Sequence, residues 1–160
     1  EIQTRFGKFR MRAYEQTTTQ QIHIALTTGD WEIGEPILTR INSTRISDDI
    51  LGLLTTGIDR RLEDIFTVIN SEGKGAVLFI QHRQAAENLL SRLEQLTQIQ
   101  KEGVLDKAPP LPMDERDFGI GAQILHDLNI NKLKVMTNST QKPRIGLTGY
   151  GLEISSYVNY

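Results

Sequence analysis

Ala76-Val77-Leu78-Phe79-Ile80 is a run of five apolar residues, and such a run is typical of a strand buried on both faces of a sheet. Residues 59–72 before it predict an amphipathic helix, because apolar residues recur there at i, i+3, i+4 and i+7. These residues are Leu62, Ile65, Phe66 and Ile69. Gly73 ends the helix, so helix and strand together predict an α/β arrangement.

The same patterns extend this unit in both directions. We expect further strands at residues 4–14, 22–26, 36–43, 133–137 and 152–158, and further helices at 84–101, 114–129 and 140–150, the last interrupted by Pro143. The proline-rich residues 104–113 predict a loop. Strand and helix alternate only after about residue 60, which indicates α/β (α+β) topology. We therefore predict N-terminal antiparallel strands followed by βαβ units on a mixed sheet, in a single domain spanning residues 1–160.

Composition excludes several classes of protein. The chain has 160 residues, a formal net charge of -2 and no cysteine, which excludes disulfides and thiolate metal sites and argues against a nucleic-acid partner. It contains no apolar run long enough for a membrane helix and no apolar signal-peptide core at its start. These features predict a cytoplasmic protein without a membrane partner. The first residue is Glu1 rather than Met, which fits a fragment of a longer chain.

Several segments together carry a family resemblance. They are residues 4–9, 23–30, 36–43, 114–125, and 137–153 with Thr137-Asn138-Ser139 and Gly149-Tyr150-Gly151. The twelve residues 114–125, DERDFGIGAQIL, are the most specific of them. Together they resemble GTP cyclohydrolase II, a zinc enzyme that begins riboflavin synthesis. The resemblance implies GTP as ligand, zinc and magnesium as cofactors, and a homodimer.

The zinc ligands of that family are missing. Its three cysteine positions correspond here to Arg45, Thr56 and Ile58, and the histidine of its Arg-x-His-Ser stretch corresponds to Asn42. The family's Gln-Glu-Gly-Arg-Gly loop also lacks its Glu-Gly-Arg core in residues 81–87. Ring opening needs a metal that lowers the pKa of its bound water to about 7. We therefore predict no metal cofactor and no ring opening.

Histidines do not replace the missing cysteines in the sequence pattern. His23, His82 and His126 are far apart and form no metal-binding motif. We expect His23 on a strand, His82 at a strand end and His126 on a helix.

Other family positions are retained. Asp114 and Arg116 correspond to residues proposed to release pyrophosphate, and Arg40, Thr137 and Lys142 correspond to nucleotide contacts. Each has a structural alternative: Asp114 suits a helix N-cap, and the others suit solvated polar groups at loop ends. Gly119 and Gly121 favour close helix packing over a phosphate loop. Three aromatic residues could stack on a base, although packing is the simpler role: Tyr14, Trp31 and Tyr150.

Two main functions follow. The first is a degenerate domain with a structural, regulatory or residual nucleotide-binding role, fused or associated with 3,4-dihydroxy-2-butanone 4-phosphate synthase, as the resemblance implies. The second is an active enzyme, either a cyclohydrolase with an unforeseen metal site or one that converts GTP to GMP and pyrophosphate through Arg116. A new ligand in a cleft beside Arg45 is a third, weaker hypothesis.

Overall fold

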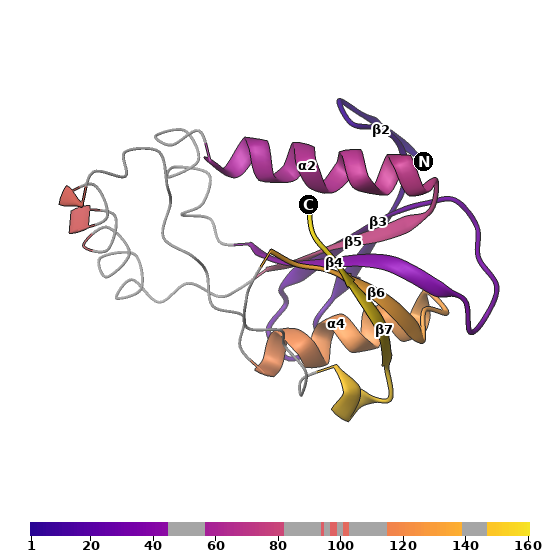
Figure 1. Cartoon of the computed structure of the whole chain (residues 1–160). Helices are drawn as coiled ribbons and strands as arrows, with labels where there is room; N and C mark the ends of the chain where they lie inside the picture. The colour runs from indigo at the N-terminus through magenta and orange to yellow at the C-terminus, as the bar shows by residue number, and fades with distance from the viewer. Residues whose placement is uncertain (45–56, 82–93, 95–96, 99–100, 103–114, 139–146) are drawn as a thin grey trace.

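A mixed sheet forms the centre of the protein, as predicted, and within the described residues it has seven strands where the sequence predicted six (Figure 1). The computed structural model describes residues 1–44, 57–81, 94, 97–98, 101–102, 115–138 and 147–160, with the backbone alone at 43–44, 57–59 and 115–117. The strands are β1 (Ile2–Thr4), β2 (Gly7–Glu15), β3 (Ile22–Thr28), β4 (Pro36–Thr44), β5 (Gly75–Gln81), β6 (Lys132–Met136) and β7 (Glu153–Val158). Their order across the sheet is β1-β2-β3-β5-β4-β6-β7.

The sheet has an antiparallel part and a parallel part. β1, β2, β3 and β5 pair in antiparallel fashion, whereas the β5–β4, β4–β6 and β6–β7 pairs are parallel. The carboxyl ends of β4 to β7 therefore meet at one edge of the sheet. The apolar run Ala76–Ile80 lies on β5 in the middle of the sheet, as its composition predicts. Its residues are buried, except Phe79, which is partly buried.

One helix packs on each face of the sheet (Figure 1). α2 (Gly57–Glu72) precedes β5, and α4 (Glu115–Asp127) precedes β6, so both helices begin near the carboxyl ends of the parallel strands. No helix within these described segments is long and apolar enough to cross a membrane. Each helix thus connects strand ends at one edge to strand starts at the other.

Two apolar clusters hold the layers together. On the α2 side, the predicted positions Ile65, Phe66 and Ile69 are buried, and Leu62 is partly buried. On the α4 side, Ala122, Leu125 and Leu128 are buried and Phe118 is partly buried, again as predicted. Burying side chains of this size stabilises the fold by about 1.5–3 kcal/mol each.

The first predicted strand was wrong in its bounds. Residues 4–14 do not form one strand, because the chain turns between β1 and β2 and the two strands pair as a hairpin. Gly7 has φ 124°, a conformation open to glycine. The Thr4 hydroxyl also donates to the Gly7 carbonyl at 2.9 Å and accepts from the Phe6 N–H at 3.1 Å.

Other predicted elements agree or fall outside the described residues. The helix at 84–101 is described only at Glu94, Thr97, Gln98 and Lys101, each of which is helical, and the loop at 104–113 lies outside. Of the predicted helix at 140–150, the structure describes a short 3-10 turn, η1 (Thr148–Tyr150).

Candidate anion-binding site

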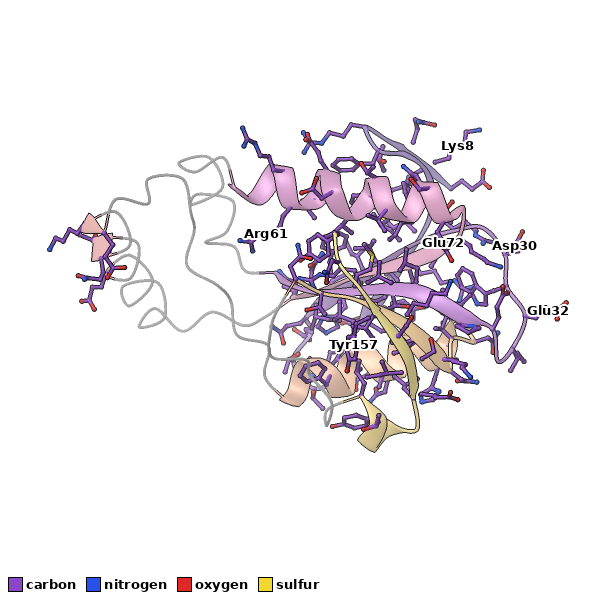
Figure 2. The ribbon with its side chains drawn as sticks, in the orientation of Figure 1. Lys8, Asp30, Glu32, Arg61, Glu72 and Tyr157 are labelled. Carbon is purple, nitrogen blue, oxygen red and sulfur yellow. The ribbon has the colours of Figure 1, made fainter. Side chains whose placement is uncertain are left out.

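The electrostatic potential is positive at the carboxyl edge of the parallel strands. Both helices begin there, and a helix N-terminus carries the equivalent of about half a positive charge. Arg61, in the second turn of α2, extends toward the strand ends (Figure 2). Ligands of open α/β sheets commonly bind outside the carboxyl ends of the strands. This edge is therefore the first place to look for a site.

Arg40 is the central side chain of the candidate site, in the middle of β4 and beside the carboxyl end of β6. It lies on β4, where its Nε donates to the Asn42 Oδ1 atom at 2.8 Å. Its Nη1 donates across the sheet to the Met136 carbonyl at 2.9 Å, at the end of β6. Its guanidinium carbon lies 5.0 Å from the centre of the Tyr160 ring. These contacts fix the guanidinium in one orientation.

The positive charge of Arg40 has no carboxylate partner among the described residues. Burial lowers the pKa of the Arg40 guanidinium, the nearby Arg61 lowers it further, and Tyr160 opposes the shift. A buried charge is costly unless it is paired. The geometry therefore favours a negatively charged ligand at Arg40.

Asn42 adds a second donor. Its Oδ1 accepts from Arg40, so its amide nitrogen Nδ2 must find a separate acceptor, and no hydrogen-bond partner for this buried atom occurs in the described part of the chain. An unsatisfied buried donor costs about 1–3 kcal/mol. Arg40 and Asn42 together thus present N–H donors that an anion would satisfy.

The end of β6 completes the edge. Thr137 is buried, and its N–H donates to the Val158 carbonyl at 2.9 Å. The Asn138 side chain forms hydrogen bonds with both backbone groups of Tyr160. Tyr160 is partly buried against the α2-side cluster. The sequence after β7 is thereby held beside Arg40.

The structure brings together two of the predicted nucleotide contacts. Arg40 bonds to Met136, the residue before Thr137, so Arg40 and Thr137 are neighbours. Arg116 lies in the first turn of α4 at the same edge of the sheet, and nothing further is described for its side chain. Asp114 and Lys142 lie outside the described residues, so their roles stay predictions.

The residues present do not fit a zinc ion. The chain has no cysteine, and the positions matched to zinc ligands are arginine, threonine and isoleucine. Arg45 and Thr56 lie outside the described residues, and Ile58 lies in the first turn of α2. No three His, Asp or Glu side chains come together as metal ligands within the described residues. We therefore derive no step through zinc.

The histidines have structural contacts. His23 is buried on β3, and its Nδ1 accepts the Gln81 N–H at 3.1 Å. His126 is exposed on α4, with its ring nitrogens near the Asn131 Oδ1 and the Tyr150 carbonyl. Both lie on the predicted element types, and His82 lies outside the described residues.

Gly119 and Gly121 permit close packing, as predicted. A Cβ on Gly119 would lie 2.9 Å from the Tyr150 hydroxyl oxygen, and one on Gly121 would lie 3.1 Å from Ile41 Cδ1 on β4. Tyr150 therefore packs on α4. The two other aromatic residues also have structural contacts: Tyr14 donates to Asp127 Oδ2 at 2.8 Å, and the Trp31 indole donates to the Leu128 carbonyl at 3.0 Å.

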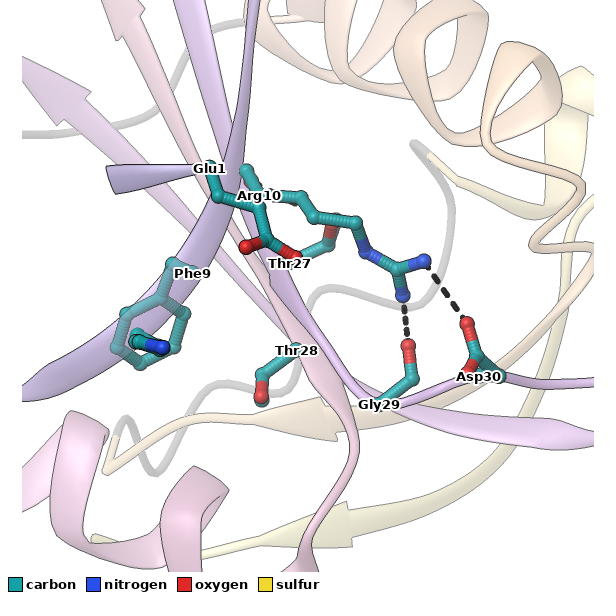
Figure 3. Close-up of a pocket in the computed structure, with 8 residues that line it drawn as sticks. Glu1, Phe9, Arg10, Thr27, Thr28, Gly29 and Asp30 are labelled. Atoms are coloured by element: carbon teal, nitrogen blue, oxygen red, sulfur yellow. Dashed lines mark hydrogen bonds and ion pairs between the residues drawn. The ribbon is translucent and has the colours of Figure 1, made fainter. Parts of the chain in front are cut away.

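A hollow of about 250 Å³ lies at the opposite edge of the sheet (Figure 3). Arg10 lines it, but its guanidinium already donates to Asp30 Oδ1 at 2.8 Å and to the Gly29 carbonyl. Arg10 in this hollow therefore has a carboxylate partner, unlike Arg40 among the described residues.

Sequence reasoning missed Asn138, Tyr160 and Arg61 as members of the site. Asn42 was noted only as a substituted histidine. Asn42 and Arg40 are two residues apart on a predicted strand, so their side chains lie on the same face. The sequence therefore contained a signal that could have placed Asn42 beside Arg40. The contact with Tyr160 joins distant segments and had no such signal.

Known proteins with similar sequences belong to one family. The sequence model of the family described as GTP cyclohydrolase II matches residues 1–159. Riboflavin biosynthesis protein RibBA of Cytophaga hutchinsonii is 37% identical over 162 residues, covering 99% of this chain and 40% of that protein. The RibBA proteins of Chlorobium phaeovibrioides and Bacillus cytotoxicus are each 36% identical over 157 residues, covering 96% of this chain and 38% and 39% of theirs. The chain thus spans about two fifths of the length of these relatives.

Proposed function

Because the chain belongs to the GTP cyclohydrolase II family of riboflavin biosynthesis, we propose that it binds the phosphate groups of a guanine nucleotide at Arg40. The observation that carries this proposal is the partly buried guanidinium without a carboxylate partner among the described residues. Arginine suits phosphate because its planar fork donates two parallel hydrogen bonds.

The surroundings of Arg40 support the same ligand class. The Asn42 amide offers a further buried donor, and Arg61 contributes a second positive charge. The first turn of α2 adds its helix dipole at this edge, on the face of the sheet where Tyr160 contacts Arg40, whereas α4 packs on the opposite face. Donors and positive potential dominate this part of the site, whereas the hollow beside Arg10 pairs its cation with Asp30.

We also propose that the chain does not open the guanine ring. A catalytic zinc site needs three protein ligands and an open position, and the matched positions supply none of the required donors. The proposed role is that of a nucleotide-binding domain that is structural or regulatory.

Calorimetry with GTP and with guanosine tests the binding proposal. We expect GTP to bind and guanosine to bind at least tenfold more weakly, because the phosphates supply the negative counter-charge for the Arg40 guanidinium. Zinc content and the ultraviolet absorbance of GTP, measured on the same preparation, test the loss of ring opening. Equal affinity for GTP and guanosine would contradict phosphate recognition, and stoichiometric zinc with GTP turnover would contradict the loss of ring opening.

Conversion of GTP to GMP and pyrophosphate is the second candidate. The observation that favours it is that Arg116 lies in the first turn of α4, at the carboxyl edge of the parallel strands. Pyrophosphate release by the wild-type protein, lost in Arg116→Ala, would support this activity. Release that persists in Arg116→Ala would contradict a reaction through Arg116.

The relatives are about two and a half times as long as this chain, which suggests that a further domain accompanies it. We propose that this domain accompanies a 3,4-dihydroxy-2-butanone 4-phosphate synthase domain, in the same chain or in an assembly, and that it forms a homodimer. Light scattering and a synthase assay of the full-length protein, with and without these residues, test both parts. Unchanged assembly and synthase activity after their removal would contradict a structural role.

A further inference from the structure

Tyr160 lies directly against the side chain that carries the proposed function. The centre of its ring is 5.0 Å from the guanidinium carbon of Arg40, within the distance of a cation–π contact. The ring also packs against the apolar cluster beneath α2. One face of the Arg40 guanidinium is therefore covered by an aromatic ring.

The backbone of Tyr160 is held from both sides by one side chain. Its N–H donates to Asn138 Oδ1 at 2.9 Å, and the Asn138 amide nitrogen donates to the Tyr160 carbonyl. The preceding ladder bond, from the Thr137 N–H to the Val158 carbonyl, is 2.9 Å long. Asn138 thus continues the β6–β7 pairing beyond the end of β7, and it fixes where the Tyr160 ring can lie.

These contacts leave part of Arg40 available. A guanidinium has five N–H donors, and Arg40 uses Nε for Asn42 and one Nη1 hydrogen for Met136. With one edge bonded and one face covered, the plane of the group is fixed. The remaining donors, mainly on Nη2, have no acceptor among the described residues and can meet a ligand without a loss of rotamer freedom on binding.

We propose that Tyr160 is a positioning residue that holds the Arg40 guanidinium ready for an anion, and that Asn138 holds Tyr160 in place. For its ligand, this inference rests on the proposed function. The competing explanation is that Tyr160 only fills space in the apolar cluster. A phenylalanine would keep both the stacking and the packing, whereas a leucine would keep only the packing.

Tyr160→Phe and Tyr160→Leu, titrated with inorganic pyrophosphate by calorimetry, separate these explanations. We expect Tyr160→Phe to bind like the wild type and Tyr160→Leu to raise the Kd about fivefold. Asn138→Ala leaves the ring in the protein but removes its two backbone contacts, and we expect it to raise the Kd about twofold. Equal affinity of wild type and Tyr160→Leu would overturn the inference.

The NMR shift of the Arg40 Nε–H proton, measured without ligand, provides a second readout. The ring current of Tyr160 should move this signal, and the displacement should persist in Tyr160→Phe and vanish in Tyr160→Leu. If wild-type protein does not bind pyrophosphate, the phosphate proposal fails, and this shift alone decides the stacking. An unchanged shift in Tyr160→Leu would show that Tyr160 does not position Arg40.

Discussion

Two of the arginine clusters on this sheet can be compared, one where β2 meets the end of α4 and one where the middle of β4 meets the carboxyl end of β6. In the first, Arg12 Nη1 lies 3.1 Å from Asp127 Oδ2, which also accepts the Tyr14 hydroxyl at 2.8 Å. In the second, Arg40 donates only to uncharged oxygens of Asn42 and Met136 among the described residues. The two clusters therefore differ in whether the described residues supply the counter-charge.

The exposure of the two clusters explains what the difference costs. The side chains of Arg12 and Asp127 are 56% and 57% exposed, and exposed ion pairs contribute roughly 0–1 kcal/mol. Arg40 is partly buried, so its charge and the Asn42 amide, both without a partner among the described residues, oppose folding. A cluster that lowers stability in the free protein is understandable where a ligand supplies the missing charge.

Removal of the Arg40 charge should produce the largest effect. We expect Arg40→Gln to raise the Kd for GTP roughly thirtyfold, since a hydrogen bond to a charged group contributes about 1.5–3 kcal/mol. The free energy of unfolding should change by less than about 1 kcal/mol, because an unpaired buried cation is lost along with its contacts. Calorimetry and urea unfolding measure the two quantities.

Arg12→Gln is the matched control for that substitution. It removes an arginine from the same sheet, but one that already has a carboxylate partner. We expect its Kd for GTP to equal that of the wild type. If both substitutions weaken GTP binding equally, GTP affinity depends only on the net charge of the protein, and Arg40 forms no specific site.

A carboxylate introduced beside Arg40 should give that arginine a counter-charge within the protein, as Asp127 does for Arg12. Asn42→Asp places a carboxylate where Oδ1 already accepts from Arg40 Nε at 2.8 Å. We expect the Kd for GTP to rise about tenfold, because the new carboxylate competes with phosphate for the guanidinium. The free energy of unfolding should rise by about 1 kcal/mol, since the unsatisfied amide is removed.

Asn70→Asp serves as the control for this charge change. Asn70 lies exposed near the C-terminal end of α2, where its Nδ2 donates to the Phe6 carbonyl at 2.7 Å. The same loss of an amide and gain of a negative charge should leave GTP affinity unchanged there. An Asn42→Asp protein that binds GTP as tightly as the wild type would show that Asn42 is not at the ligand.

The framework of this site could be predicted from sequence because its elements have strong local signals. The apolar run on β5 and the helical spacing of Ile65, Phe66 and Ile69 each depend on neighbouring residues. The hairpin between β1 and β2 was missed because the turn depends on the positive φ of Gly7 and a Thr4 side-chain contact.

The charge balance of the site could not be predicted in the same way. Family resemblance pointed to Arg40 and Thr137, but it did not show which cations have partners. That distinction depends on contacts between distant segments, such as Arg40 with Met136 and Arg12 with Asp127. Asp114 and Lys142 lie outside the described residues, so their predicted roles stand as predictions.

Breaking the paired cluster should have a small effect. Asp127 ends α4, where the helix dipole disfavours a carboxylate, so Arg12 offsets an unfavourable charge. Asp127→Asn removes both the ion pair and that unfavourable charge while keeping an acceptor for Tyr14. We expect the free energy of unfolding to change by less than about 0.5 kcal/mol in urea. A loss above about 2 kcal/mol would contradict this account of the exposed cluster.

The smallest expected effect concerns another paired charge, Glu35 with Lys74. The hydrogen bond from Lys74, followed by one from the Glu32 backbone, lowers the pKa of Glu35 from its ordinary value of 4.5. A carboxyl whose pKa is lower in the folded state contributes stability that is fully present above its unfolded pKa. That contribution disappears as the pH falls through the lowered, folded-state pKa.

We therefore expect the wild type to have a slightly higher Tm than Glu35→Gln at pH 7, and the difference to vanish only below about pH 4.5. Melting curves of both proteins between pH 7 and pH 3 measure the difference. Because Arg40 has no such carboxylate among the described residues, Arg40→Gln should show no comparable acid transition in its Tm difference. A transition in that variant at the same pH would indicate a carboxylate near Arg40 and would weaken the contrast between the two clusters.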